Sequence, residues 1–284
     1  MNEASPAAGP RPWRPSLFMQ VGFGLHAGAA GLLLASPERW PLALGALAAC
    51  HVAITAAGMW PRSRLLGPNL LRLTASQAAA GSVALTLDDG PHPEVTPQVL
   101  DLLDRHQARA TFFCVGRKVE EHAAVAQEIV RRGHDIGNHT YGHSNAFAFN
   151  GAAGMRREIE RAQQAIERAT GRVPQLFRAP AGIRNPFLEP VLCGLGLHLT
   201  AWTRRGFDTV TGDPARVAAR LTRGLRAGDI LLLHDGRSAS DARGRPVILE
   251  ALPRVLDALG ERGLRSEGIH LPPDARSNRG PSGG

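Results

Sequence analysis

The sequence is poor in cysteine. Its three cysteines, Cys50, Cys114 and Cys193, form no CxxC pair, and their odd number leaves at least one unpaired. These features argue against a disulfide framework and against a metal site made of cysteines. Each cysteine lies in an apolar stretch, so we expect it to pack as a small buried hydrophobic residue.

Aromatic residues are also scarce, at 5% of the 284 residues. The formal net charge is +8 at pH 7, but the basic residues are mostly arginines scattered along the chain. No basic stripe interleaved with aromatics and no zinc-finger motif is present, which argues against a nucleic-acid partner. The basic excess therefore favours an anionic membrane surface or an acidic substrate.

Two long segments have no charged residue at all. Residues 15–37 and 41–61 lack Asp, Glu, Lys and Arg. Only three residues, Glu38, Arg39 and Trp40, lie between the two segments. Each segment exceeds the roughly 18 residues that a helix needs to cross about 30 Å of hydrocarbon. We therefore predict a transmembrane helical hairpin at 15–61. The alternatives are a signal peptide in the first segment or a soluble hairpin packed on the main domain.

The basic residues around the hairpin predict its orientation. They are Arg11 and Arg14 before it, Arg62, Arg64 and Arg72 after it, and Arg39 in the connecting loop. By the positive-inside rule, both outer flanks face the cytoplasm. We therefore predict a protein of the cytoplasmic membrane whose larger domain faces the cytoplasm.

Residues 82–270 predict a single α/β domain. Apolar, β-rich runs at 82–89 and 110–116 alternate with amphipathic helical patterns at 96–107, 118–133 and 154–171. Further strand candidates are "HDIGNHT", "QLFRAP", "HLTAWT" and "DILLLHD". This alternation predicts a mainly parallel sheet or barrel, with functional residues at the carboxyl ends of its strands. In the first helix, Thr96 is expected to be the N-cap.

The remaining segments complete the predicted organisation. Residues 1–14 form an N-terminal tail, and residues 62–81 link the hairpin to the domain. Residues 271–284 are polar and rich in Gly and Pro, so we predict that this tail is disordered.

Polar residues recur where the expected strands end. They are Asp88 and Asp89, His139 and His143, Arg178, Asp208, and His234 with Asp235. In a β/α barrel the loops after the strands meet at one rim, so these side chains are expected to lie together. Asp235 is equally well explained as a turn cap or as a catalytic residue.

The pair His139 and His143 has the spacing of a metal site. Residues four apart on a helical turn share a face, and two imidazoles with one carboxylate leave open positions on a metal. Asp88 and Asp89 can then divide their roles, because one carboxylate can ligate the cation while the other accepts a proton from the attacking water. The cation also offsets the repulsion between the two carboxylates.

These segments together resemble the polysaccharide deacetylase family, the NodB-homology domain of carbohydrate esterase family 4. "LTLDDGP" is similar to the family's first motif, "HTYGH" to its metal motif and "RAPAG" to its third motif. "WTRRGFD" keeps the Trp and the final Asp of the fourth motif, and "LLH" ending at His234 is similar to the fifth. Five motifs in the family's order, over roughly residues 82–265, make the resemblance specific.

The resemblance implies a distorted (β/α) barrel of about seven strands that holds a divalent metal, usually zinc. The metal ligands would be Asp89, His139 and His143. Asp88 would be the general base, and Arg178 would pair with Asp88 and orient it.

The resemblance also implies the groups that complete the reaction. His234 would be the general acid for the leaving amine, and Asp208 would hold His234 and raise its pKa. The backbone N–H of the residue after Pro180, here Ala181, would stabilise the oxyanion. Such a set suits amide hydrolysis, in which a poor nitrogen leaving group needs a proton.

The sequence departs from the family at four positions near these motifs. Ala181 replaces the usual Tyr or Phe, and Arg205 stands where the family often has Asp. Thr209 replaces a frequent Trp, and Leu87 replaces a frequent Phe. The residues with implied chemical roles are all retained, so we expect an enzyme whose groove differs in shape from that of its relatives.

The expected activity is hydrolysis of an N-acyl group, acetyl or formyl, from an amino sugar in a polysaccharide or a lipid-linked glycan. A cytoplasmic active site beside a membrane favours the lipid-linked substrate, whereas a secreted enzyme would act on a cell-wall polymer. Two alternatives stay open, an O-acetyl carbohydrate esterase and a catalytically silent carbohydrate-binding protein on the same fold. The sequence does not indicate an oligomeric state.

Overall fold

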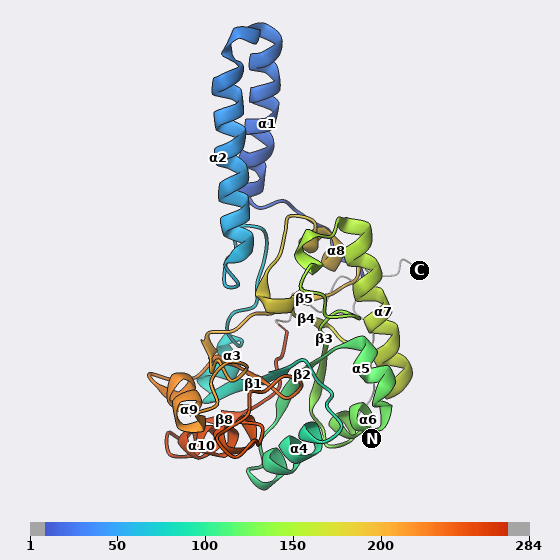
Figure 1. Ribbon diagram of the computed structural model, residues 1–284, viewed down its shortest axis with the longest axis vertical. Helices are drawn as coiled ribbons and strands as arrows, with labels where there is room; N and C mark the ends of the chain where they lie inside the picture. The colour runs from blue at the N-terminus through green and yellow to red at the C-terminus, as the bar shows by residue number, and fades with distance from the viewer. Residues whose placement is uncertain (1–8, 272–284) are drawn as a thin grey trace, which may run out of the picture.

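The computed structural model of the chain describes residues 9–271. The tail predictions for residues 1–8 and 272–284 concern positions outside the described residues. Figure 1 shows two parts, a long helical hairpin and a larger domain built around a curled sheet.

The sheet of the larger domain is parallel throughout. Its strands are β1 (Ser82–Asp88), β2 (Ala110–Cys114), β3 (Asp135–Asn138), β4 (Leu176–Phe177), β5 (His198–Leu199), β6 (Arg204–Arg205) and β7 (Ile230–His234). Their order is β5-β4-β3-β2-β1-β7-β6, and the short β8 (Arg265–Ser266) pairs with the start of β1. These seven strands curl into a half-barrel, which confirms the predicted distorted barrel of about seven strands.

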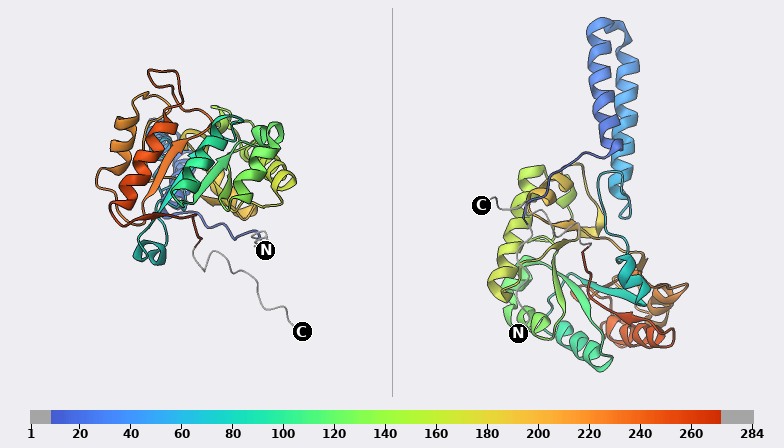
Figure 2. Two further views of the ribbon diagram at one scale, coloured as in Figure 1. Left: turned by 90° about the horizontal axis from the view of Figure 1, so that it is seen from below. Right: turned by 180° about the vertical axis from the view of Figure 1, so that it is seen from behind.

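Helices cover the outer face of the sheet (Figures 1 and 2). They are α4 (Val95–Arg105), α5 (Gly116–Glu121), α6 (Ala123–Arg131), α7 (Ala152–Thr170), α8 (Leu188–Gly194), α9 (Pro214–Thr222) and α10 (Ile248–Gly260). A short helix, α3 (Ala75–Ala79), precedes β1. Most of these helices have the amphipathic pattern that the sequence shows, and their apolar faces lie on the sheet.

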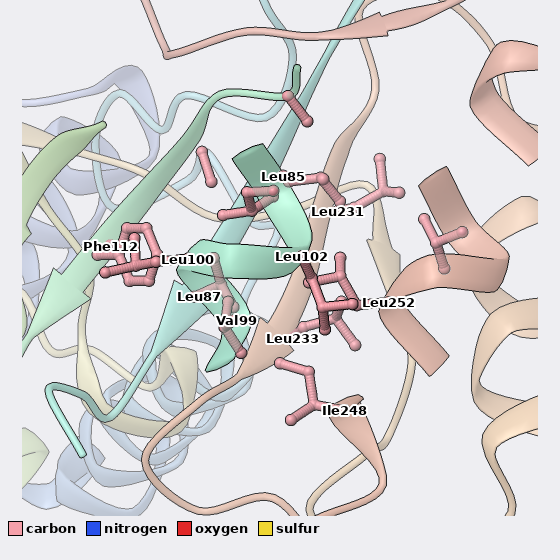
Figure 3. Close-up of a cluster of buried hydrophobic side chains, with 14 of the residues drawn as sticks. Leu85, Leu87, Val99, Leu100, Leu102, Phe112, Leu231, Leu233, Ile248 and Leu252 are labelled. Carbon is pink, nitrogen blue, oxygen red and sulfur yellow. The ribbon is translucent and has the colours of Figure 1, made fainter. Parts of the chain in front are cut away.

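The alternation along β1 separates the core from the site. Leu85 and Leu87 point outward and pack with Leu100 of α4 and Leu252 of α10 in the main hydrophobic cluster (Figure 3). Because successive side chains of a strand point to opposite faces, the intervening Thr86 and Asp88 point to the inside of the curl. The apolar residues of β1 therefore anchor the strand, and its polar residues face the interior of the half-barrel.

Two local predictions were wrong. Helix α4 begins at Val95, and Thr96 lies in its first turn instead of capping it. The Thr96 hydroxyl accepts a hydrogen bond from the backbone N–H of His92 and donates one to Asp235. The helix predicted at 118–133 is two helices, α5 and α6, because His122 between them has the non-helical angles φ −131° and ψ 48°.

The hairpin consists of α1 (Leu17–Ala35) and α2 (Trp40–Met59), joined by a 3₁₀ turn at Pro37–Arg39. It projects from the larger domain (Figure 1 and the right view of Figure 2). Both helices are long and apolar enough to cross a membrane by length and composition. Large apolar side chains such as Leu34 and Val52 are exposed on them, and His26 Nε2 lies 3.3 Å from His51 Nε2 between the helices.

Candidate active site

Asp88 ends β1 and has a buried cationic partner. Arg178 Nη1 donates to Asp88 Oδ1 at 2.6 Å and to Thr86 Oγ1 at 2.7 Å. Arg178 is 0% exposed and Asp88 is 3% exposed. Burial of either charge alone would be costly, and the ion pair offsets part of the cost of burying both groups.

Asp89 belongs to a second cluster, formed with two imidazoles. Its Oδ1 lies 2.9 Å from His143 Nε2 and 3.4 Å from His139 Nε2. One ligand atom from each of the three residues lies within 4.8 Å of the other two. Burial opposes ionisation of Asp89, but hydrogen bonds and charge from the two imidazoles outweigh it and lower the pKa of this carboxyl.

The three residues of this cluster fit a divalent metal. His139 Nδ1 lies 2.8 Å from the carbonyl oxygen of Arg178, which can only accept, so Nδ1 carries the proton and Nε2 is left with a free lone pair. Among the described residues, no donor other than these two imidazoles is available to the buried Oδ1 of Asp89. A carboxylate oxygen and two imidazole nitrogens are donors that zinc accepts, with a position left open for substrate.

His234 lies at the end of β7, directly beside Asp88 in the sheet register. Its Nδ1 lies 2.9 Å from Asp208 Oδ1, and its backbone N–H donates to Asp208 Oδ2 at 2.7 Å. Burial lowers the pKa of His234, but the hydrogen bond and charge of the fully buried Asp208 outweigh it and raise this pKa. The imidazolium form of His234 is therefore favoured, with Nε2 as its free N–H.

Pro180 and Ala181 lie in a 3₁₀ turn after β4. Ala181 has φ 55° and is exposed, and no hydrogen bond within residues 9–271 uses its N–H. Positive φ values at non-glycine residues are costly, and in the described chain they occur at Asp89, Thr140, His143, Ala181, Phe207 and Gln107. All of these except Gln107 lie in or beside the segments that carry the predicted site residues.

The structure brings together seven of the nine residues predicted for the site, namely Asp88, Asp89, His139, His143, Arg178, Asp208 and His234. Pro180 and Ala181 follow Arg178 in the loop after β4. Asp235 is different, since it is buried, accepts a hydrogen bond from Thr96 at 2.5 Å, and has its pKa raised by burial to about 6. Through this hydrogen bond Asp235 joins the start of α4 to the loop after β7.

Sequence reasoning missed Lys118. Its Nζ donates to the carbonyl oxygens of Asp89 at 2.7 Å and of Gly236 at 3.3 Å, so it ties the loop after β1 to the loop after β7. Lys118 is the only lysine in the sequence. The other 32 of its 33 basic Lys and Arg residues are arginines. That singularity is the one sequence signal that could have drawn attention to it.

The base of the hairpin contacts the same rim. Arg184, in the loop after β4, donates its backbone N–H to Gly58 O at 3.1 Å and its guanidinium to Ser63 O at 2.6 Å. Arg62 Nη1 approaches the carbonyl of Thr203, after β5, at 3.5 Å. The end of α2 and its following loop therefore lie against the loops that follow β4 and β5, beside Ala181.

Comparison with known proteins gives a consistent family. The family model for polysaccharide deacetylases matches residues 75–199. A chitooligosaccharide deacetylase of Azorhizobium caulinodans is 35% identical over 200 residues, covering 68% of this chain and 93% of that protein. A peptidoglycan-N-acetylglucosamine deacetylase of Bacillus cereus is 33% identical over 186 residues, covering 64% and 84%.

Solved structures show the same similarity. A family 4 carbohydrate esterase from Streptomyces lividans, in complex with acetate, has a TM-score of 0.61 at 33% identity and covers 67% of this chain and 93% of its own. A family 4 acetyl xylan esterase from Clostridium thermocellum, in complex with a cobalt ion, has a TM-score of 0.58 at 31% identity, covering 66% and 87%.

Proposed function

Because the chain belongs to the polysaccharide deacetylase family and is a hydrolase acting on carbon–nitrogen bonds, we propose that it removes an N-acyl group from an amino sugar in a metal-dependent reaction. The observation that carries the proposal is the meeting of three units at one rim. These are the Asp89–His139–His143 cluster, the Arg178–Asp88 pair and the Asp208–His234 pair. The relatives named as deacetylases of chitooligosaccharide and peptidoglycan support an N-acetylated amino sugar.

The proposed mechanism assigns one task to each unit. A divalent metal, for which one carboxylate and two imidazoles suit zinc, would be held by Asp89, His139 and His143 and would acidify a water and polarise the acyl carbonyl. Asp88 takes the proton of the attacking water, and the hydrogen bond from Arg178 orients this carboxylate.

The remaining steps use the other side chains at the rim. The N–H of Ala181 stabilises the negative charge that develops on the acyl oxygen. His234, protonated because Asp208 raises its pKa, gives a proton to the leaving nitrogen as the carbon–nitrogen bond breaks. The products are the free carboxylic acid and the amino sugar.

We further propose that the hairpin anchors the enzyme in the cytoplasmic membrane with its active site at the membrane surface. Support comes from the exposed apolar faces of α1 and α2 and from the contacts of Gly58 and Ser63 with the loop after β4. Arg62 and Arg64 at the hairpin base suit an anionic surface. An active site in this place favours an amino sugar linked to a membrane lipid over a long polymer.

The test is an assay of substrates with the full-length protein in detergent and zinc. We expect acetate release from a polyprenyl diphosphate-linked N-acetylglucosamine and slower release from chitooligosaccharides. Asp88→Asn should lower the rate by roughly 10²- to 10⁴-fold, the usual contribution of a general base. Activity confined to O-acetyl xylan, or full activity in Asp88→Asn, would refute the assignment.

A further inference from the structure

Three arginines and two aromatic rings form a continuous row that leads away from the catalytic carboxylate. The Trp202 ring centroid lies 5.7 Å from Cζ of Arg178 and 5.7 Å from Cζ of Arg205. The Phe207 ring centroid then lies 5.0 Å from Cζ of Arg205 and 5.2 Å from Cζ of Arg220. We call these five residues the arginine row. Its aromatic rings hold guanidiniums in place by cation–π contacts.

The charge of the arginine row is neutralised at only one end. Arg178 is paired with Asp88 at 2.6 Å. No carboxylate among residues 9–271 forms an ion pair with Arg205 or Arg220 within 4.0 Å. The neighbouring Arg204 contrasts with them, because its Nε donates to Asp229 at 2.7 Å.

Arg205 also has an unused donor. Its Nε is buried and has no hydrogen-bond acceptor within the described part of the chain. Arg220 donates to Thr211 Oγ1 at 3.0 Å and keeps an exposed side chain. A buried guanidinium N–H without an acceptor is unfavourable, and an anion that accepts from it would remove this cost.

The position of Arg205 in the sheet places it on the same face as His234. On the sheet, Arg205 pairs with Leu232 of β7, and His234 follows two residues later on the same face. Phe207 directly precedes Asp208, the partner of His234, and is 45% exposed. The arginine row therefore starts at Arg178, the partner of Asp88, and reaches solvent at Phe207 and at Arg220 of α9.

We propose that Arg205, with Arg220 beyond it, binds a phosphate group carried by the amino-sugar substrate. This inference rests on the proposed function. A phosphate at the anomeric carbon of a 2-acylamino sugar is attached next to the carbon that bears the acylated nitrogen, so it must lie close to His234 when the amide is in place. Two unpaired guanidiniums beside one ring suit a phosphate or diphosphate, whose oxygens accept several charge-assisted hydrogen bonds.

The experiment measures binding by calorimetry to the full-length zinc-loaded protein in detergent. The probes are N-acetylglucosamine, its 1-phosphate, UDP-N-acetylglucosamine, a farnesyl diphosphate-linked N-acetylglucosamine, and N-acetylmuramic acid as a carboxylate probe. We expect the phosphorylated sugars to bind more tightly than the neutral sugar. Arg205→Gln should weaken their binding by about 10- to 100-fold, as expected for one lost charge-assisted hydrogen bond, and should change binding of the neutral sugar far less.

Arg254→Gln is the matched control, since it removes the same charge from α10 and should leave every affinity unchanged. The tighter of the nucleotide-linked and lipid-linked probes identifies the source of the phosphate. Equal affinities for neutral and phosphorylated sugars, an equal loss for both in Arg205→Gln, or a preference for the carboxylate probe would overturn the proposal. This experiment measures binding and not turnover. If the separate activity assay shows no acetate release, the proposed function is refuted, but the binding result is still valid.

Discussion

At the scale of single residues, Asp88 and Asp89 show how neighbouring carboxylates acquire different partners. Asp88 continues β1, and its side chain faces the buried Arg178 at 2.6 Å. Asp89 leaves the strand with φ 71°, which turns its carboxylate toward His139 and His143. Asp88 thus faces a guanidinium and Asp89 faces two imidazoles, so different groups offset the repulsion between the two carboxylates.

The Asp208–His234 pair makes a prediction about pH. His234 must be protonated to act. Burial lowers its pKa, but Asp208 outweighs burial and raises it. Activity is therefore present below this pKa and is lost as pH rises through it. Asp208→Asn should lower the pKa of His234, so the alkaline loss of kcat should begin at lower pH. A pH–rate profile of acetate release would measure the shift. An alkaline limb that stays in place would show that another group titrates there.

The candidate site residues could be named from the sequence because they lie in short motifs, some with a visible chemistry and some through the resemblance to the family. The strand alternation of "LTLDD" and the HxxxH spacing place Asp88, Asp89, His139 and His143 without knowledge of the fold. The contacts of Lys118 with Asp89 and Gly236 could not be predicted in this way. They join segments far apart in sequence through carbonyl oxygens, which carry no residue-specific signal.

At the scale of elements, the apolar runs of the sequence predicted the strands of the larger domain. The helix boundaries were predicted less accurately. Thr96 has the composition of an N-cap, but Asp235 offers its hydroxyl a buried acceptor, and this tertiary contact outweighs the local preference. Residues 118–133 have one continuous helical pattern, yet the chain turns at His122. No local sequence pattern indicates that α2 docks against the loop after β4.

This docking predicts an unequal response of two glycines in α2. A Cβ on Gly58 would lie within 2.2 Å of the carbonyl oxygen of Arg184, whereas a Cβ on Gly45 would meet nothing within 4 Å. Both Gly→Ala changes should stabilise the helix itself by similar amounts, since glycine is a poor helix former. Gly58→Ala should nevertheless lower kcat, because the loop that carries Ala181 must shift.

The measurement compares acetate release and thermal unfolding of Gly58→Ala and Gly45→Ala in the same detergent. Gly45→Ala should keep the kcat of the unchanged protein and should unfold at the same or a slightly higher temperature. If the two variants have the same kcat, then the hairpin base does not position the loop after β4, and the contact has no catalytic consequence.

At the scale of the whole molecule, the hairpin and the larger domain act together if the active site works at a membrane. The proposed orientation rests on Arg11 and Arg14 before the hairpin and on Arg62, Arg64 and Arg72 after it. Because the hairpin crosses twice in this proposal, both of its flanks lie on the same side. In this proposal the larger domain then faces the cytoplasm.

A reporter fused to the carboxyl terminus tests this orientation. We expect fluorescence from a C-terminal green fluorescent protein and no activity from a C-terminal alkaline phosphatase, which folds only outside the cytoplasm. The same fusions placed after residue 37, in the loop between the helices, should give the reverse pattern. An active C-terminal phosphatase would eliminate a cytoplasmic substrate and restore a cell-wall polymer as the alternative.

The central claim is that Asp89, His139 and His143 hold the metal while Asp88 takes the proton, and a zinc titration tests it most directly. Metal-free protein is titrated with zinc while bound zinc and acetate release are measured together. The account predicts that acetate release rises to a plateau at one zinc per chain, that His139→Ala loses both signals, and that Asp88→Asn binds one zinc without releasing acetate. Acetate release without metal, or full release by Asp88→Asn, would contradict the account.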